Sequence, residues 1–160
     1  MPNLLFPKQI DNNFRGYRTS IAIFAFVILI KGIQGTMSML DTYNIATGAD
    51  GIALDQMNPA GAHEVLNLFT LLGMYVVVLP LQSLVVLLRW RALIPFMYLM
   101  LIGVQLGARA INTLYATARV IPADAPSFAG HPVGFWVNLT LLTLTAVGFI
   151  LSLTPRGEKQ

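Results

Sequence analysis

Four long runs of apolar residues limit what this chain can fold into. They span about 19–40, 62–88, 92–116 and 133–154, and the second carries no charged residue between Val65 and Leu88. A helix that crosses the hydrocarbon core of a bilayer needs about 20 apolar residues, because it rises only about 1.5 Å per residue. Each run meets that length. The sequence therefore predicts an all-α polytopic membrane protein, an antiparallel bundle of four transmembrane helices.

The composition agrees with that prediction. Only 11% of the residues are charged and 56% are hydrophobic, with a mean hydropathy of +0.68, whereas soluble domains carry about 25% charged residues. So few polar side chains cannot cover a water-soluble particle, which excludes a disordered chain, a coiled coil and an ordinary soluble enzyme. The absence of cysteine excludes disulfides, thiol catalysis and cysteine-ligated metals.

Three connections join the predicted helices. The second consists only of Arg89, Trp90 and Arg91, and so short a link requires the flanking helices to run antiparallel as a hairpin. The other two, at 41–61 and 117–132, are rich in Gly, Pro, Asn and Asp and are predicted to be loops. Because no internal repeat or interdomain linker is present, we expect residues 1–160 to form a single four-helix transmembrane domain.

Basic residues are concentrated on one side of the predicted bundle. Seven of the ten Lys and Arg residues lie in the N-terminal tail, the short second link and the C-terminal tail. Because cytoplasmic segments of membrane proteins are enriched in Lys and Arg, we expect both termini on the cytoplasmic side of a bacterial-type inner membrane.

The first apolar run also has the basic flank of a signal peptide, but no small-residue cleavage site follows it, so we expect a retained helix. The basic residues lie beside apolar runs and do not alternate with aromatics, which argues against nucleic-acid binding.

Polar side chains inside the predicted helices gather at similar depths. At about 1.5 Å per residue, Lys31 and Gln105 lie roughly 13 Å below the outer surface, and Arg109 lies roughly 7 Å below it. Lys31 shares a helix face with Gln34, and Gln105 shares one with Arg109, because each pair has helical spacing. We therefore predict a polar binding pocket in the outer half of the bundle. Its candidate ligand-binding residues are Lys31, Gln34, Glu64, Asn67, Gln105, Arg109 and Asn138.

Lys31 is the most informative of these residues. A lysine at the centre of a membrane helix costs about 2.5–3.5 kcal/mol on insertion scales, so a partner or a water-filled cavity should offset that cost. The alternative is that the apolar part of the Lys31 side chain extends outward and places the ammonium among the lipid headgroups. The depth of ~13 Å, however, exceeds the roughly 6 Å reach of the side chain. For Arg109, which is shallower, we weigh extension to the surface against an ion pair with Glu64.

The remaining motifs indicate less about function. Gly103 and Gly107 form a G-x-x-x-G on the third predicted helix, nearly opposite its polar stripe, so this face is available for packing within the bundle or for self-association. His63 and His131 lie at helix ends without metal-ligand spacing, and the sequence names no cofactor. It contains no nucleotide-binding, serine-hydrolase or zinc-protease motif.

These observations favour a non-enzymatic accessory or binding subunit of the membrane. Its pocket would hold a lipid headgroup, a quinone-like molecule or a side chain of a partner protein. The subunit would form a homo-oligomer through Gly103 and Gly107 or join a larger membrane complex. The alternative is a small transporter or membrane enzyme that acts on an anionic substrate through Lys31 and Arg109. An enzyme would lose activity but stay folded when Lys31 is neutralised, whereas a structural subunit would lose assembly.

Overall fold

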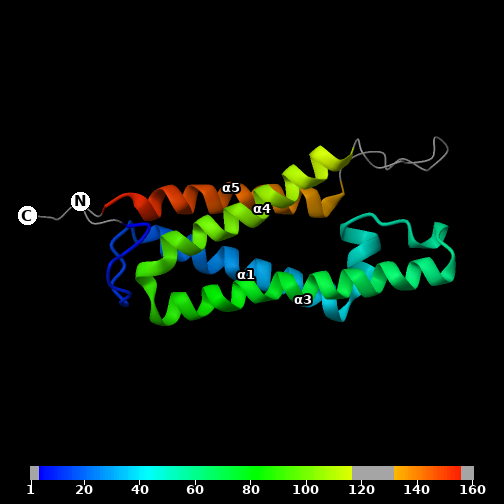
Figure 1. Ribbon diagram of the computed structural model, residues 1–160, viewed down its shortest axis with the longest axis horizontal. Helices are drawn as coiled ribbons and strands as arrows, with labels where there is room; N and C mark the ends of the chain where they lie inside the picture. The colour runs from blue at the N-terminus through cyan, green and yellow to red at the C-terminus, as the bar shows by residue number, and fades with distance from the viewer. Residues whose placement is uncertain (1–3, 117–131, 156–160) are drawn as a thin grey trace, which may run out of the picture.

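The computed structural model describes residues 4–116 and 132–155, apart from the side chains at 112, 113, 115 and 116. Its long helices are α1 (Thr19–Leu40), α3 (Pro59–Arg89), α4 (Ile94–Ala116) and α5 (Val133–Leu153) (Figure 1). Each contains a stretch long and apolar enough to cross a membrane. The predicted all-α bundle of four transmembrane helices is therefore confirmed, and the chain is a multi-pass membrane protein.

The start of α3 differs from the prediction. The helix begins at Pro59 rather than near residue 62. The Asn58 side chain accepts a hydrogen bond from the backbone N–H of Gly61 at 2.7 Å, which satisfies one of the free donors of the first turn. Pro59 occupies the first helical position, where its missing N–H removes no helical hydrogen bond. The run from Asn58 to Gly61 is thus the capped start of the helix and not a loop before it.

The connection at 41–61 is more ordered than the predicted loop. It contains a short helix α2 (Thr42–Asn44), a π-helical turn η1 (Ile45–Ala49) and a 3₁₀ turn η2 (Leu54–Gln56). The hydroxyls of Thr42 and Thr70 lie 3.0 Å apart, which ties α2 to α3. Ala46 is fully buried, so η1 packs into the end of the bundle. The predicted loop at 117–132 lies outside the described residues except for Pro132.

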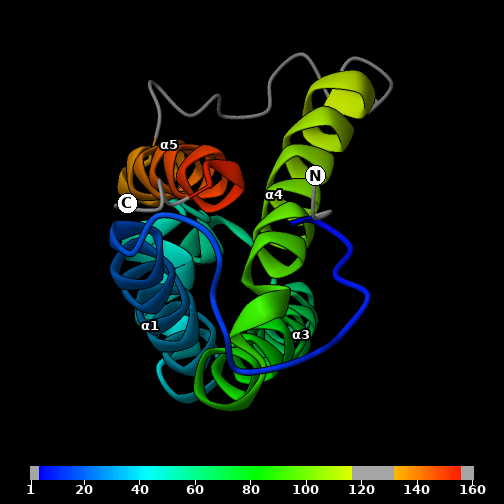
Figure 2. The same ribbon diagram turned by 90° about the vertical axis from the view of Figure 1, so that its left-hand side faces the viewer.

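The helices contact one another unequally. α1 packs most extensively against α3, and α5 packs against both α1 and α4. α3 and α4 are joined by the 3₁₀ turn η3 (Arg91–Leu93), as the predicted hairpin requires, but α4 then runs diagonally away from α3 toward α5 (Figures 1 and 2). α1 and α3 approach each other closely at Gly35 and Gly73. A Cβ added to Gly73 would lie 2.9 Å from the Gly35 carbonyl oxygen.

Residues 4–18 fold across one end of the bundle. The backbone N–H of Ala92 donates to the carbonyl of Asp11 at 3.2 Å, and Gly16 forms an isolated bridge with Pro155. The ring of Phe6 lies 5.9 Å from that of Phe96. The N-terminal segment, the end of α5 and the α3–α4 link therefore lie at the same end, as an even number of crossings requires. Most of the buried apolar cluster, including Phe24, Val27, Val86, Ile94, Met97 and Tyr98, belongs to this half.

Candidate functional site

Lys31 points into the bundle and bonds to another helix. Its Nζ donates a hydrogen bond to Asn138 Oδ1 at 2.5 Å, which connects α1 to α5. The Asn138 amide nitrogen in turn donates to the carbonyl of Gly134 at 2.9 Å, one turn earlier in α5. This second bond fixes the amide so that its oxygen faces the lysine. The amide partner offsets part of the cost of placing a lysine within a membrane helix.

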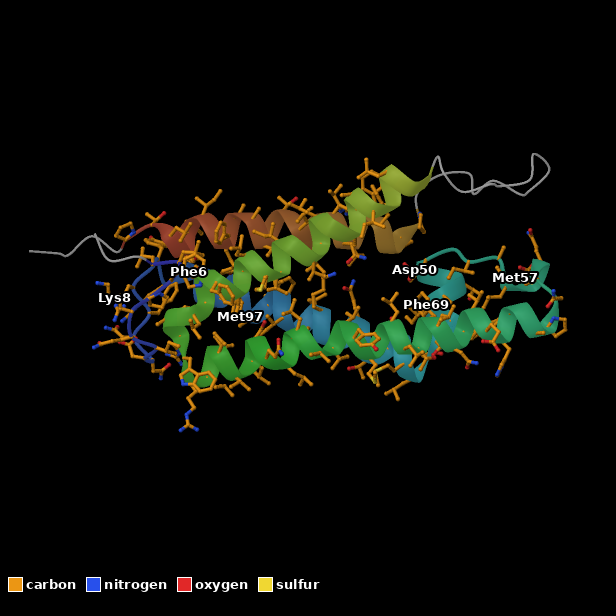
Figure 3. All side chains as sticks on the ribbon, viewed as in Figure 1. Phe6, Lys8, Asp50, Met57, Phe69 and Met97 are labelled. Atoms are coloured by element: carbon orange, nitrogen blue, oxygen red, sulfur yellow. The ribbon has the colours of Figure 1, made fainter. Side chains whose placement is uncertain are left out.

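A pocket of about 230 Å³ lies beside this pair of side chains. Four elements form it. α1 and α5 supply polar groups, α3 supplies an apolar wall, and the η1 segment closes one end. The lining residues are Lys31, Gln34, Ser38, Ile45, Ala49, Asp50, Phe69, Leu72, Gly73, Val76, Gly134 and Asn138. None of them belongs to α4. Figure 3 shows Asp50 and Phe69 approaching the same region from η1 and α3.

Asp50 reaches the pocket because η1 folds back onto the start of α5. A Cβ added to Gly134 would lie 2.5 Å from Asp50 Oδ1 and 2.9 Å from the carbonyl oxygen of Ala49. Glycine at position 134 is therefore what allows η1 to approach so closely. Although Asp50 is exposed as a whole residue, partial burial raises the pKa of its carboxyl above the ordinary value. Asp50 was not among the predicted site residues.

Arg109 lies near the pocket without lining it. Its guanidinium carbon is 4.9 Å from the centroid of the Phe135 ring, a cation–π arrangement. It is also near enough to Lys31 for the two cations to interact electrostatically. The described side chains of Arg109 and Glu64 do not form an ion pair with each other. Within residues 4–116 and 132–155 the one ion pair joins Arg15 and Asp11, at 2.9 Å, at the opposite end of the bundle.

The remaining predicted site residues are divided between two locations. Gln105 does not line the pocket, and its Nε2 donates to Thr145 Oγ1 at 3.3 Å, two helical turns along α5 from Asn138. Glu64 and Asn67 are exposed on α3 and do not line the pocket. The structure thus brings together Lys31, Gln34 and Asn138, and adds Ser38, Asp50 and the apolar wall of α3.

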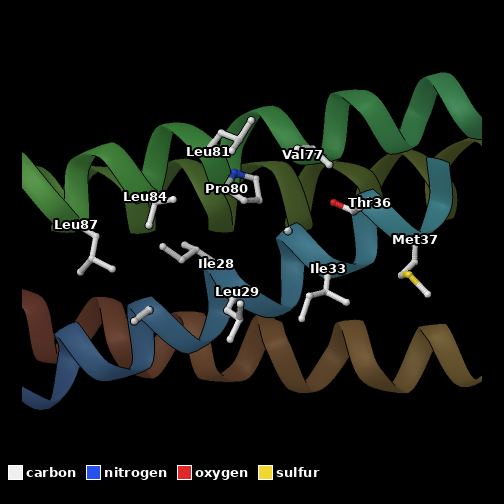
Figure 4. Close-up of a pocket in the computed structure, with 12 residues that line it drawn as sticks. Ile28, Leu29, Ile33, Thr36, Met37, Val77, Pro80, Leu81, Leu84 and Leu87 are labelled. Atoms are coloured by element: carbon white, nitrogen blue, oxygen red, sulfur yellow. The ribbon is translucent and has the colours of Figure 1, made fainter. Parts of the chain in front are cut away.

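A larger apolar groove lies on the other side of the contact between α1 and α3. Its volume is about 550 Å³, and its lining includes Gly32, Thr36, Pro80 and Leu81 but no charged residue (Figure 4). Leu81 is 57% exposed, so the groove opens onto the surface that faces the membrane. Such a surface suits hydrocarbon chains and offers no group for chemistry.

The described part of the chain holds no group of three or more His, Asp or Glu residues that could bind a metal ion. His63 is exposed, and His131 lies outside the described residues. No protein-family model, no curated protein and no solved structure matches this chain.

Proposed function

We propose that this protein is a non-enzymatic membrane protein that binds an amphiphile, with the polar headgroup of the amphiphile at Lys31. The observation that carries this proposal is the position of the lysine. It lies inside the bundle, bonded to Asn138, beside a cavity of about 230 Å³. A lysine there is costly, so a bound anionic group would both use and stabilise it.

The division of the pocket walls supports an amphiphile over a fully polar ligand. Lys31, Gln34, Ser38 and Asn138 provide the polar side, whereas Phe69, Leu72 and Val76 on α3 provide the apolar side. Leu72 is 56% exposed and the neighbouring Leu68 is 65% exposed, so the apolar wall continues onto the surface of α3. Since α4 supplies no lining residue, an acyl chain could leave the pocket along α3 toward the bilayer.

The wider role follows from the same features. We propose an accessory or binding subunit of a bacterial-type inner membrane, with both termini in the cytoplasm and the pocket in the outer half. A Cβ added to Gly103 or Gly107 would meet no atom within 4 Å in the described structure, so this face of α4 is available for a second copy or a partner subunit. A quinone-like ligand or a partner side chain are the other occupants that the pocket chemistry admits.

One observation favours a second candidate function. Because Lys31 and Arg109 interact electrostatically, a small transporter or membrane enzyme could hold an anionic substrate between them. This alternative requires both cations at the ligand, whereas the binding proposal requires only Lys31. Arg109→Gln should therefore abolish anion binding under the alternative and preserve most lipid retention under the binding proposal.

Mass spectrometry of lipids retained after purification in nanodiscs tests the proposal. We expect wild-type protein to retain an amphiphile that Lys31→Met loses, while the bundle stays folded. Lys8→Met is the matched control, because Lys8 is exposed at the opposite end of the molecule. Equal lipid retention by all three proteins would contradict the proposed function.

A further inference from the structure

Two opposite charges line the same pocket without pairing with each other. Lys31 bonds to the Asn138 amide, and the Asp50 carboxyl lies against Gly134. No ion pair joins them within the described ranges. Gly134 and Asn138 are one helical turn apart, so the residues that the two charged groups contact lie on successive turns of α5.

The other walls of the pocket do not neutralise this separation of charge. The lining residues on α3 and on α5 include no titratable side chain. From α4, Arg109 adds positive potential on the Lys31 side. The pocket is therefore positive toward Lys31 and negative toward Asp50.

A ligand with one charge would satisfy only part of such a site. A simple anion at Lys31 would be repelled by Asp50, and a simple cation at Asp50 would be repelled by Lys31. A molecule that carries both charges on a short link meets both groups. The apolar wall of α3 requires the same molecule to have a hydrocarbon part.

We propose that the pocket selects a zwitterionic phospholipid whose headgroup carries a primary amine, of the phosphatidylethanolamine type. This inference rests on the proposed function and specifies its ligand. The phosphate would accept hydrogen bonds from Lys31, whose ammonium has donors beyond the one given to Asn138, and the ligand ammonium would donate to Asp50. A primary ammonium suits a carboxylate because it donates N–H hydrogen bonds, whereas a trimethylammonium group has none. Quaternary ammonium groups are held instead by several aromatic rings, and Phe69 is the one aromatic residue in the lining.

A structural role for Asp50 is the main competing explanation. A carboxylate at the first turn of α5 interacts favourably with the helix dipole, and this alone could account for its position. In that case Asp50→Asn would change stability but would leave the choice of lipid unchanged. Lipid selectivity, not stability, is therefore the measurement that separates the two explanations.

The test uses full-length protein in nanodiscs with equal amounts of phosphatidylethanolamine, phosphatidylglycerol and phosphatidylcholine, followed by mass spectrometry of the bound lipids. We expect wild-type protein to be enriched in the ethanolamine lipid by about two- to fivefold, the range of a partly exposed ion pair. Asp50→Asn should lose this preference in favour of phosphatidylglycerol, and Lys31→Met should lose both phospholipids. Asp55→Asn is the matched control, since Asp55 is exposed on the same connection.

Each outcome separates the two proposals. Preference of the wild type for phosphatidylglycerol, or an unchanged preference in Asp50→Asn, would overturn the zwitterionic ligand while Lys31-dependent retention still supported the proposed function. Retention that does not depend on Lys31 would overturn both. Binding of free phosphoethanolamine as tightly as the lipid would overturn the lipid assignment. If Asp50→Asn fails to fold, acidification of the wild type removes the same charge, and an unchanged preference at acid pH would overturn the inference.

Discussion

Tyr98 of α4 lies across the backbone of Gly148 on α5. Its hydroxyl then reaches α1, where it donates a hydrogen bond to the carbonyl of Ser20 at 2.7 Å. The Tyr98 side chain is fully buried, and its ring meets that of Phe24 edge-on at a centroid distance of 5.0 Å. One side chain thus joins three helices. Only glycine fits at position 148, because an added Cβ would overlap the hydroxyl and ring of Tyr98.

Gly148→Ala should therefore destabilise the bundle, by about 1–3 kcal/mol as is typical of overpacked cores. Unfolding in a mixed-micelle SDS titration measures the change. Gly103→Ala is the control, because no atom lies within 4 Å of its Cβ position, and it should be neutral or slightly stabilising.

Tyr98→Phe alone should cost about 0.5–1.5 kcal/mol through the lost hydrogen bond. Tyr98→Phe also removes the hydroxyl that would overlap the new Cβ at position 148. The double variant with Gly148→Ala should therefore be less destabilised than the sum of the two single variants, and strict additivity would contradict this packing.

The membrane helices were predictable because their apolar length is a property of each segment alone. α1 and α5 match the predicted bounds to within a residue, and α3 was missed only at its cap. How the helices pair was not predictable in this way. The sequence drew attention to Gly103 and Gly107, but the close crossing joins Gly35 to Gly73, one glycine on each of two helices. No motif within a single helix can reveal such a pair.

The candidate site was predictable in part. Lys31, Gln34 and Asn138 all lie in the outer half of the predicted bundle, and depth can be counted along a helix. Glu64, which was expected near the membrane surface, does not line the pocket. α3 has 31 residues, so it is about 46 Å long and extends beyond the bundle. Asp50 could not be predicted, because its position depends on the π-helical turn of η1 folding back onto Gly134.

Self-association through α4 makes a specific prediction. A Cβ added at Gly103 or Gly107 would have no neighbouring atom within 4 Å in the described structure, so a second helix could approach this face closely. Gly107→Ile should reduce the oligomer without unfolding the bundle, because the added side chain projects from the free face. Light scattering in detergent measures the oligomer, with Gly48→Ala as a control at another open glycine. A monomeric wild type, or an oligomer of unchanged size in Gly107→Ile, would exclude this interface.

The orientation in the membrane can be tested with single cysteines, since the chain has none of its own. Lys8 and Asp55 are both exposed. Lys8 lies at one end of the bundle, and Met57, two residues after Asp55, lies at the other end (Figure 3). If the basic end is cytoplasmic, Asp55→Cys should react with an impermeant thiol reagent in intact cells. Lys8→Cys should react only after permeabilisation. The reverse pattern would show that the termini are outside.

Acid pH should change the lipid that the pocket selects. Burial raises the pKa of Asp50 above the ordinary aspartate value of 3.8, so its carboxyl becomes neutral at a higher pH than that of an exposed aspartate. Among the described residues, the other charged groups near the pocket are the cations Lys31 and Arg109, and the lipid phosphate remains anionic. As pH falls through the raised pKa, the site therefore loses its negative group alone, and the preference should shift from phosphatidylethanolamine to phosphatidylglycerol. Lipid retention measured across this range should show the shift in wild-type protein and in Asp55→Asn. Asp50→Asn should favour phosphatidylglycerol at every pH, and a shift of equal size in that variant would assign the effect to another group.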